Sequence, residues 1–152
     1  MIAAAAILSP LAGGGPALAQ TAVGPPVEVD VSLSPAATAK LAAAKETIVV
    51  LADFFGVPIS EKERMADQGR LQLAPEQSIE IPGAGVAHIA GPKYQKAQLK
   101  LVEGGDVKIA VTVISARHSS PDNLLACDYF EESLKLATSK PLKVNCKLIS
   151  EQ

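Results

Sequence analysis

Side chains able to do chemistry are densest in the polar run that follows the strongly apolar residues 107–115. A guanidinium can bind an anion through two hydrogen bonds, an imidazole can act as acid or base, and an activated serine can be a nucleophile. Loops that follow rigid strands often carry functional sites. We therefore define residues 117–123 as the candidate loop, with these candidate binding residues: Arg117, His118, Ser119, Ser120, Asp122 and Asn123.

A catalytic role for this loop would need more than the residue types. Neither Ser119 nor Ser120 lies in a G-x-S-x-G sequence, the sharp turn that exposes a nucleophilic serine in many hydrolases. Ser-Pro-Asp-Asn is also an ordinary turn and capping sequence. The sequence thus predicts no catalytic residue, and it favours a loop that serves as a binding edge beside a disulfide.

Cys127 and Cys146 are the two cysteines of the chain. An even number of cysteines in an exported protein predicts a disulfide, which should stabilise the fold by about 3 kcal/mol. Their spacing is not C-x-x-C, so it does not support a redox-catalytic pair. His88 and His118 add no spacing typical of zinc ligands, and we predict neither a metal nor a cofactor.

Other polar residues have simpler structural interpretations. Asp53 falls in an apolar strand and is expected to face solvent near the strand end. His88 alternates with Val86 on a short strand and should lie at a rim or in a satisfied position. Residues 83–85, Gly-Ala-Gly, lack the spacing and the following helix of a phosphate-binding loop, so they indicate a turn.

Residues 1–19 are uncharged and have the features of an export signal. An apolar stretch is broken near Pro10, and Ala17-Leu18-Ala19 forms a small-x-small cleavage site. The uninterrupted apolar run is shorter than the roughly 18 residues that a membrane-spanning helix needs. We expect cleavage after Ala19, a periplasmic or secreted location, and no membrane insertion of the mature chain.

The composition of the chain disfavours some classes of partner. With 14 basic and 16 acidic residues the net charge is -2, and no long run of like charge is present. Nothing therefore favours nucleic acid or an anionic membrane. The lack of tryptophan, with two tyrosines and three phenylalanines, disfavours a stacking platform for bases or sugars. The remaining expectation for a partner is another exported protein.

Strands dominate the pattern of the mature chain. Two-residue alternation of Val and Leu with polar residues predicts a half-buried strand at 27–33, and Ser34-Pro35 predicts the start of a helix to Ala44. Gly104-Gly105-Asp106 between two apolar runs indicates a hairpin. The other predicted elements are strands at 46–55, 71–73, 78–81, 86–89 and 142–149, hairpin strands at 98–103 and 107–115, and a surface helix at 61–68.

Regularly spaced short strands predict a mainly β fold, an antiparallel β-sandwich with short helical inserts at the ends of the sheets. An α+β fold with one antiparallel sheet and a packed helix is the alternative. The predicted organisation is a signal peptide at 1–19, a flexible N-terminal segment at 20–26, and one β-sandwich domain at 27–150. Cys146 alternates with Leu142 and Val144, so it should point into the core.

Two segments resemble known proteins. Residues 27–50 read Val-Glu-Val-Asp-Val-Ser-Leu-Ser-Pro-Ala-Ala, then Lys40 and a renewed apolar strand, which is similar to the opening of the β-rich C-terminal periplasmic domain of cytochrome c biogenesis proteins. The Ser-Ala-Arg to Asp-Asn-Leu-Leu run and the closing Cys146-Lys147-Leu148-Ile149 resemble small exported proteobacterial proteins of unassigned activity. The second resemblance implies a periplasmic fold and carries no catalytic residue. Haem-attachment and thiol motifs are missing, so a role in cytochrome assembly is not adopted.

These observations predict a non-enzymatic periplasmic or secreted module that binds a protein or assists the cell envelope. One alternative is an inhibitor of an exported hydrolase, a lysozyme or a protease, that would insert the candidate loop into a cleft. A second alternative is a small hydrolase that uses His118 with a nearby serine.

Overall fold

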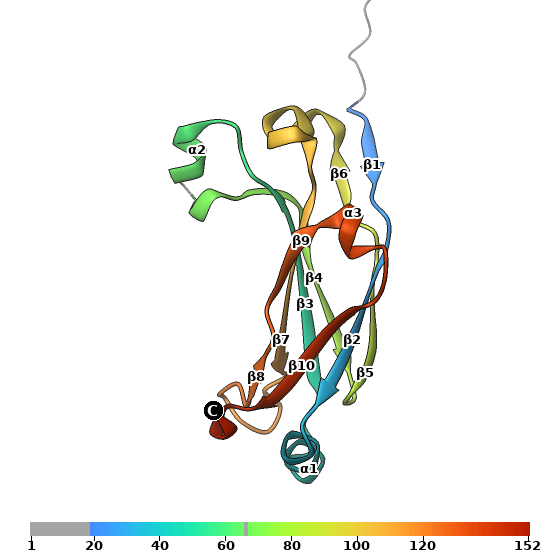
Figure 1. Cartoon of the computed structure of the whole chain (residues 1–152), viewed down its shortest axis with the longest axis vertical. Helices are drawn as coiled ribbons and strands as arrows, with labels where there is room; N and C mark the ends of the chain where they lie inside the picture. Colours follow the sequence, from blue (N-terminus) through green and yellow to red (C-terminus); the bar gives the residue numbers. More distant parts are fainter. Residues whose placement is uncertain (1–18, 66) are drawn as a thin grey trace, which may run out of the picture.

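Two four-stranded β-sheets pack face to face and form the body of the protein (Figure 1). The computed structural model describes residues 19–65 and 67–152. The expected signal peptide, residues 1–19, lies outside the described residues except for Ala19. The mainly β, sandwich-like fold predicted from the strand pattern is confirmed.

The first sheet has the strand order β5-β2-β10-β8. Its strands are β5 (Gly85–Ile89), β2 (Val27–Leu33), β10 (Leu142–Leu148) and β8 (Leu125–Cys127). β2 and β10 run parallel to each other, with Val31 opposite Val144, whereas the other two pairs are antiparallel. The prediction of a purely antiparallel sandwich was therefore wrong for this central pair, because the strands that meet there are distant in sequence and no turn fixes their direction.

The second sheet has the order β4-β3-β7-β9 and is antiparallel throughout. Its strands are β4 (Leu71–Ile81), β3 (Ile48–Gly56), β7 (Lys108–Ser115) and β9 (Phe130–Ser133). β4 is one long strand where two short ones were predicted around Pro75. A proline is tolerated there because β4 lies at the sheet edge and the missing N–H is not needed for pairing.

The facing sides of the sheets form one hydrophobic core. Alternation places Val27, Val29 and Val31 inside, each at most 2% exposed, while Glu28 and Ser32 face solvent. Full burial of such a side chain stabilises the fold by about 1.5–3 kcal/mol relative to exposure. Cys146 is 4% exposed and belongs to this core, as its place in the alternation predicted.

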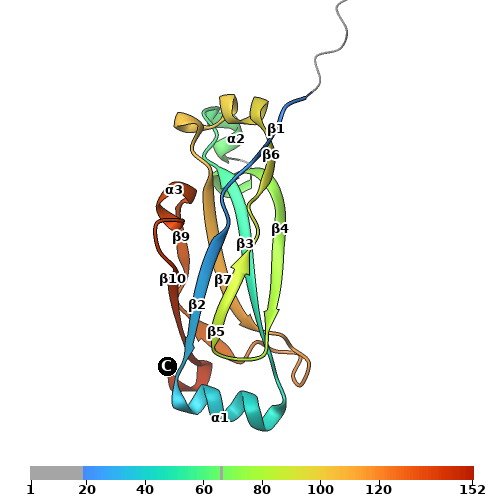
Figure 2. The same ribbon diagram turned by 90° about the vertical axis from the view of Figure 1, so that its right-hand side faces the viewer.

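Helix α1 (Pro35–Ala44) closes one end of the sandwich, and we call this the α1 end (Figure 2). Ser34 caps it, since the Ser34 hydroxyl accepts a hydrogen bond from the N–H of Ala37 at 3.0 Å. Ala37 and Leu41 are buried. Helix α2 (Glu61–Met65) lies at the opposite end, and the short α3 (Leu134–Ala137) follows β9. The helical inserts predicted at the ends of the sheets are thus present there.

Residues 20–26 were expected to be flexible, but Thr21–Val23 form strand β1. This strand pairs antiparallel with β6 (Lys93–Gln95) in a separate two-stranded sheet. Gly24 extends the contact, since its N–H donates to the carbonyl of Pro92 at 2.8 Å. The segment pairs with a partner about 70 residues away, which local sequence could not reveal.

The predicted hairpin around Gly104-Gly105 was wrong. Residues 96–101 form the 3₁₀ helix η2 (Lys96–Leu101) rather than a strand, and β7 pairs with β3 and β9. The backbone beyond η2 pairs with residues 57–59, since Glu103 N–H donates to the Val57 carbonyl at 2.8 Å. Val102 is buried against Gly56, where a Cβ atom would collide with it, so this tertiary contact overrides the hairpin signal.

Candidate functional site

The candidate loop lies at the α1 end, between the end of β7 and the start of β8 (Figure 2). The turn between β4 and β5, residues 82–84, reaches the same end. Among the described residues the buried polar or charged ones are Glu46 and Ser115, and both contact this loop. These two buried polar side chains therefore hold the candidate loop through hydrogen bonds.

Ser115 and Asn123 close the base of the loop. The Ser115 N–H donates to Asn123 Oδ1 at 2.9 Å, and the Leu124 N–H donates to Ser115 Oγ at 2.9 Å. Asn123 Nδ2 in turn donates to the Leu125 carbonyl at 2.8 Å. Of the predicted binding residues, Asn123 is thus partly buried and structural.

Glu46 holds the first half of the loop from beneath and is only 3% exposed. Its carboxylate accepts hydrogen bonds from the N–H groups of Thr47 (3.1 Å), His118 (3.2 Å) and Ser119 (2.8 Å). The Ser119 hydroxyl donates a further bond at 2.6 Å. Burial raises the pKa of Glu46, but these hydrogen bonds outweigh it and lower the pKa from 4.5 to about 2.

A second carboxylate, Glu80 on β4, holds the His118 side chain. Glu80 Oε1 lies 2.7 Å from His118 Nε2 and accepts a 2.5 Å hydrogen bond from the Thr47 hydroxyl. The Thr47 and His118 hydrogen bonds lower the pKa of Glu80, and the bond to Glu80 raises the pKa of His118. The side chains of His118 and Glu80 are both about half exposed, so this pair contributes less to the stability of the loop than the Glu46 contacts do.

The other predicted residues lie at the tip. Arg117, His118, Ser119 and Asp122 are exposed, while Ser120 is partly buried and its hydroxyl accepts from the Asp122 N–H at 3.2 Å. Arg117 has φ of 63°, the left-handed region that an arginine seldom adopts. The structure therefore brings the six predicted residues into one ordered loop, with the ionisable groups outward and Asn123 inward.

His118 and Ser119 do not face each other as the base and the nucleophile of a serine hydrolase would. His118 Nε2 faces Glu80, whereas the Ser119 hydroxyl donates to Glu46, so the base and the hydroxyl have different partners. A nucleophile needs a base within hydrogen-bond reach. Within the described residues the serine nearest in sequence to His118 is thus engaged by a carboxylate that holds the loop.

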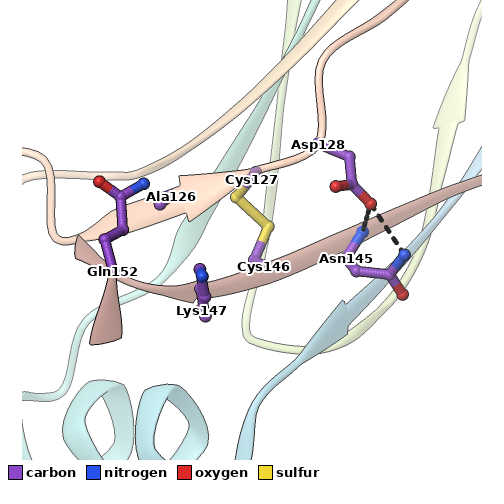
Figure 3. Close-up of a pocket in the computed structure, with 7 residues that line it drawn as sticks. All are labelled: Ala126, Cys127, Asp128, Asn145, Cys146, Lys147 and Gln152. Carbon is purple, nitrogen blue, oxygen red and sulfur yellow. Dashed lines mark hydrogen bonds between the residues drawn. A yellow bond between two sulfur atoms is a disulfide. The ribbon is translucent and has the colours of Figure 1, made fainter. Parts of the chain in front are cut away.

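Cys127 and Cys146 form the predicted disulfide. They are directly paired on β8 and β10, so the bond joins the strand that follows the candidate loop to a core strand. The disulfide borders a surface hollow of about 320 Å³ (Figure 3). Asp128 at its rim accepts hydrogen bonds from the Asn145 N–H (3.0 Å) and from Asn145 Nδ2 (2.8 Å).

His88 lies at a rim, as expected, whereas Asp53 was expected to face solvent and is instead partly buried among polar partners. Asp53 Oδ1 accepts from Gln72 Nε2 at 2.5 Å on the outer face of the second sheet, and Arg70 lies 3.7 Å from its other oxygen. His88 is largely exposed, and its Nδ1 lies 3.4 Å from Glu28. Neither residue adds a group to the α1 end.

Sequence reasoning missed three residues of this end: Lys45, Glu46 and Glu80. Glu46 was included in a predicted strand, although an acid between an Ala-rich helix and a mostly apolar strand is unusual. Lys45 ends α1 with φ of 53°, at a position where glycine is more usual. No local signal marks Glu80, whose partners Thr47 and His118 are 33 and 38 residues away.

Comparison of the chain with family models, curated proteins and solved structures found no match. In the described part of the chain, no helix has the length and apolar character required to cross a membrane. What the fold and site define is a disulfide-bonded, sandwich-like β protein with an ordered polar loop at one end.

Proposed function

We propose that this chain is a non-catalytic protein-binding module of the periplasm or the secreted space, and that the candidate loop is its binding edge. The observation that carries the proposal is the use of the buried Glu46 to hold the backbone of His118 and Ser119 while their neighbours Arg117 and Asp122 stay exposed. Three of the four hydrogen bonds to this buried carboxylate come from the loop, so it fixes the loop.

Fixing a loop before it meets a partner favours association. Binding normally loses about 0.5–1.5 kcal/mol for each flexible side chain that becomes immobile, with a further loss for ordering loop backbone. The Glu46 and Ser115 contacts reduce the backbone part of this cost in the free protein. The exposed Arg117, His118 and Asp122 then offer charged and hydrogen-bonding groups in a set arrangement.

Export supports the same proposal. The uncharged segment 1–19 ends in a small-x-small site, and a disulfide is typical of proteins that act in oxidising compartments. The partner would then be another exported protein.

A rigid loop also suits an inhibitor of an exported hydrolase, the second candidate. Such a loop must occupy a cleft without being reshaped by it, and the two-sided support of residues 115–123 favours this behaviour. The two candidates differ in a simple assay, since an inhibitor should reduce the activity of a lysozyme or protease at a one-to-one ratio.

The test is affinity capture from a periplasmic extract with residues 20–152 in the oxidised form. An Arg117→Ala, His118→Ala variant removes two exposed groups of the loop. A Lys93→Ala, Lys96→Ala variant is the matched control, because both lysines are exposed near the opposite end. The proposal expects a partner that the control retains and the loop variant loses.

Equal capture by both variants would contradict the assignment of the loop, and the absence of any captured protein would contradict the binding function. A hydrolase is tested separately with an ester and a peptide substrate. Turnover that His118→Ala abolishes without unfolding the protein would replace the proposal with the enzymatic alternative.

A further inference from the structure

Gln20 stands at the boundary between the expected signal peptide and the folded domain. The small-x-small site Ala17-Leu18-Ala19 directly precedes it, so cleavage after Ala19 makes Gln20 the first residue of the mature chain. Both Ala19 and Gln20 are exposed, and neither belongs to a strand. The bond between them therefore lies at the surface of the folded domain.

The backbone of Gln20 pairs through its carbonyl group. This carbonyl accepts a hydrogen bond from the Lys96 N–H at 2.9 Å, which extends the pairing of β1 with β6 by one residue (Figure 1). The Gln20 N–H and the Gln20 side-chain amide have no hydrogen-bond partner among the described residues. A change confined to the amine and the side chain would thus leave the pairing of β1 intact.

An N-terminal glutamine carries a nucleophile and an electrophile in one residue. Its neutral α-amine can attack Cδ of the side-chain amide and close a lactam of N, Cα, Cβ, Cγ and Cδ, the ring size of proline. The N–Cδ bond forms, the Cδ–Nε2 bond breaks, and Nε2 leaves as ammonia with the proton that the amine gives up. The product is pyroglutamate, and its formation needs no oxidant, reductant or cofactor.

The segment that pairs with Gln20 is basic. Residues 93–100 include Lys93, Lys96 and Lys100, which are all exposed, and they include no acidic residue. An α-ammonium group at Gln20 adds a like charge beside this segment. Like charges favour loss of the ammonium proton, and the neutral amine is the form that reacts. Cyclisation then removes the terminal charge permanently.

We propose that Gln20 is a modification site, and that the mature protein begins with the pyroglutamate formed from it. The inference rests on the export part of the proposed function, since cleavage after Ala19 creates the reacting amine. It goes beyond that function because it assigns a covalent change to a residue outside the candidate loop.

Strand β1 is the element that this modification protects. Thr21 and Val23 are exposed, Val23 to 65%, while Ala22 is partly buried, so the strand is held mainly by its backbone pairing with β6. Chain ends are common points of proteolysis, and an aminopeptidase needs a free α-amine to begin. Pyroglutamate lacks that amine, so the modification preserves β1 in a compartment that contains peptidases.

The test is the intact mass of the protein expressed as residues 1–152 in a bacterial host and purified from the periplasm. The expected mass is that of residues 20–152 with the disulfide formed, less one ammonia. Fragment spectra of the N-terminal peptide should place the loss at Gln20. The protein should resist an aminopeptidase until a peptidase that removes pyroglutamate has acted.

Gln20→Asn is the matched control, because it keeps a side-chain amide that is one methylene shorter. Attack by its α-amine would close a smaller, strained ring, so this variant should lose no ammonia. Its first residue is read from the same spectra. The aminopeptidase alone should then shorten the variant under conditions that leave the native protein intact.

A mature chain that begins at Gln20 with its full mass, or with the mass of a deamidated glutamine, would overturn the inference and leave export intact. A chain that begins at another residue would also overturn it. Loss of ammonia from Gln20→Asn would place the change elsewhere and overturn it as well. A chain that retains residues 1–19 would contradict export and the inference together, whereas the binding function fails in the capture experiment.

Discussion

The protein has two polar clusters in which a charged side chain is stabilised by different kinds of partner, neutral donors in one and an opposite charge in the other. At the α1 end, the buried Glu46 accepts its hydrogen bonds from uncharged groups, three backbone N–H groups and one hydroxyl. On the outer face of the second sheet, Arg70 is about one-third exposed and contacts Glu131 at 2.6 Å and the Tyr129 hydroxyl at 2.7 Å. Its guanidinium also lies 4.3 Å from the centre of the Phe55 ring.

The two clusters differ in the hydrogen-bonding groups that are left without a partner when one side chain is removed. The partners of Arg70 are side chains that can turn to water, so their loss of contact is inexpensive. The donors to Glu46 are mostly backbone groups in a partly buried position, and they keep their need for an acceptor. A buried acid with neutral donors therefore fixes a loop, whereas an exposed ion cluster covers a sheet without fixing much.

The disulfide should give the largest effect of any change at the α1 end. Replacing both cysteines, Cys127→Ala with Cys146→Ala, should lower the free energy of unfolding by about 3 kcal/mol. The reason is that the unfolded chain gains entropy when the cross-link between residues 19 apart in sequence is absent. Urea denaturation of the variant and of the oxidised protein measures the difference. Because the Glu46 contacts do not involve the cysteines, hydrogen exchange at the His118 and Ser119 amides should stay slow, and fast exchange there would show that the disulfide holds the loop.

Removal of the Glu46 carboxylate should give the next largest effect. Glu46→Ala leaves four donors without their acceptor and should cost about 2 kcal/mol, with Glu46→Gln costing less because one oxygen remains. Urea denaturation gives the loss of stability, and amide exchange at Ser119 reports on the loop.

Arg70→Met is the matched change in the exposed cluster, since methionine keeps an apolar stem over Phe55. It should cost less than about 1 kcal/mol. A larger loss for Arg70→Met than for Glu46→Ala would reverse the ranking of the two clusters.

Acid should weaken the Glu46 contacts over a defined range. The folded pKa of Glu46, about 2, is below its ordinary value of 4.5, so its contribution is complete above about pH 4.5 and is lost as the pH falls toward 2. The pKa values of Glu80, Asp128 and Glu151 are also lowered, so the native protein alone does not isolate this group. The difference in unfolding free energy between native protein and Glu46→Gln should shrink across this range, and parallel pH curves would contradict the assignment.

Much of this fold follows from local sequence. The strand Val27–Leu33 and the helix Pro35–Ala44 were predicted with the bounds that the structure has, because alternation and the Ser34-Pro35 cap act over a few residues. The pairing of Cys127 with Cys146 follows from the count of cysteines. The strand pattern was also sufficient to predict a sandwich.

The errors arise where distant contacts decide the structure. The segment 98–103 has an apolar alternation, yet Val102 packs on Gly56 and the backbone pairs with residues 57–59. The candidate loop was found from its residue types, but Glu46 was not, because its donors are one residue away on one side and 72 or 73 away on the other. The residue types thus marked the loop, but they did not reveal the buried group that fixes it.

Changes at the His118 side chain should have the smallest effect on stability. This residue makes both kinds of contact, one through its backbone and one through its side chain. Its backbone N–H is held by the buried Glu46, and its side chain is held by the exposed Glu80. The bond to Glu80 raises the pKa of His118 above 6.5, so the side-chain contribution is complete below pH 6.5 and is lost as the pH rises through the folded pKa. Proton NMR titration of the imidazole in the native protein and in Glu80→Gln should show this pKa fall in the variant.

His118→Gln should remove that pH dependence and leave amide exchange at His118 and Ser119 unchanged, because Glu46 holds the backbone whatever the charge of the imidazole. Faster exchange in His118→Gln would mean that the exposed pair orders the loop, and the distinction between the two clusters would then fail at the residue where they meet. Unchanged exchange would instead show that the loop keeps its shape without the imidazole. In the native protein the imidazole can then respond to a partner or to pH without reshaping the loop, as a preformed binding edge requires.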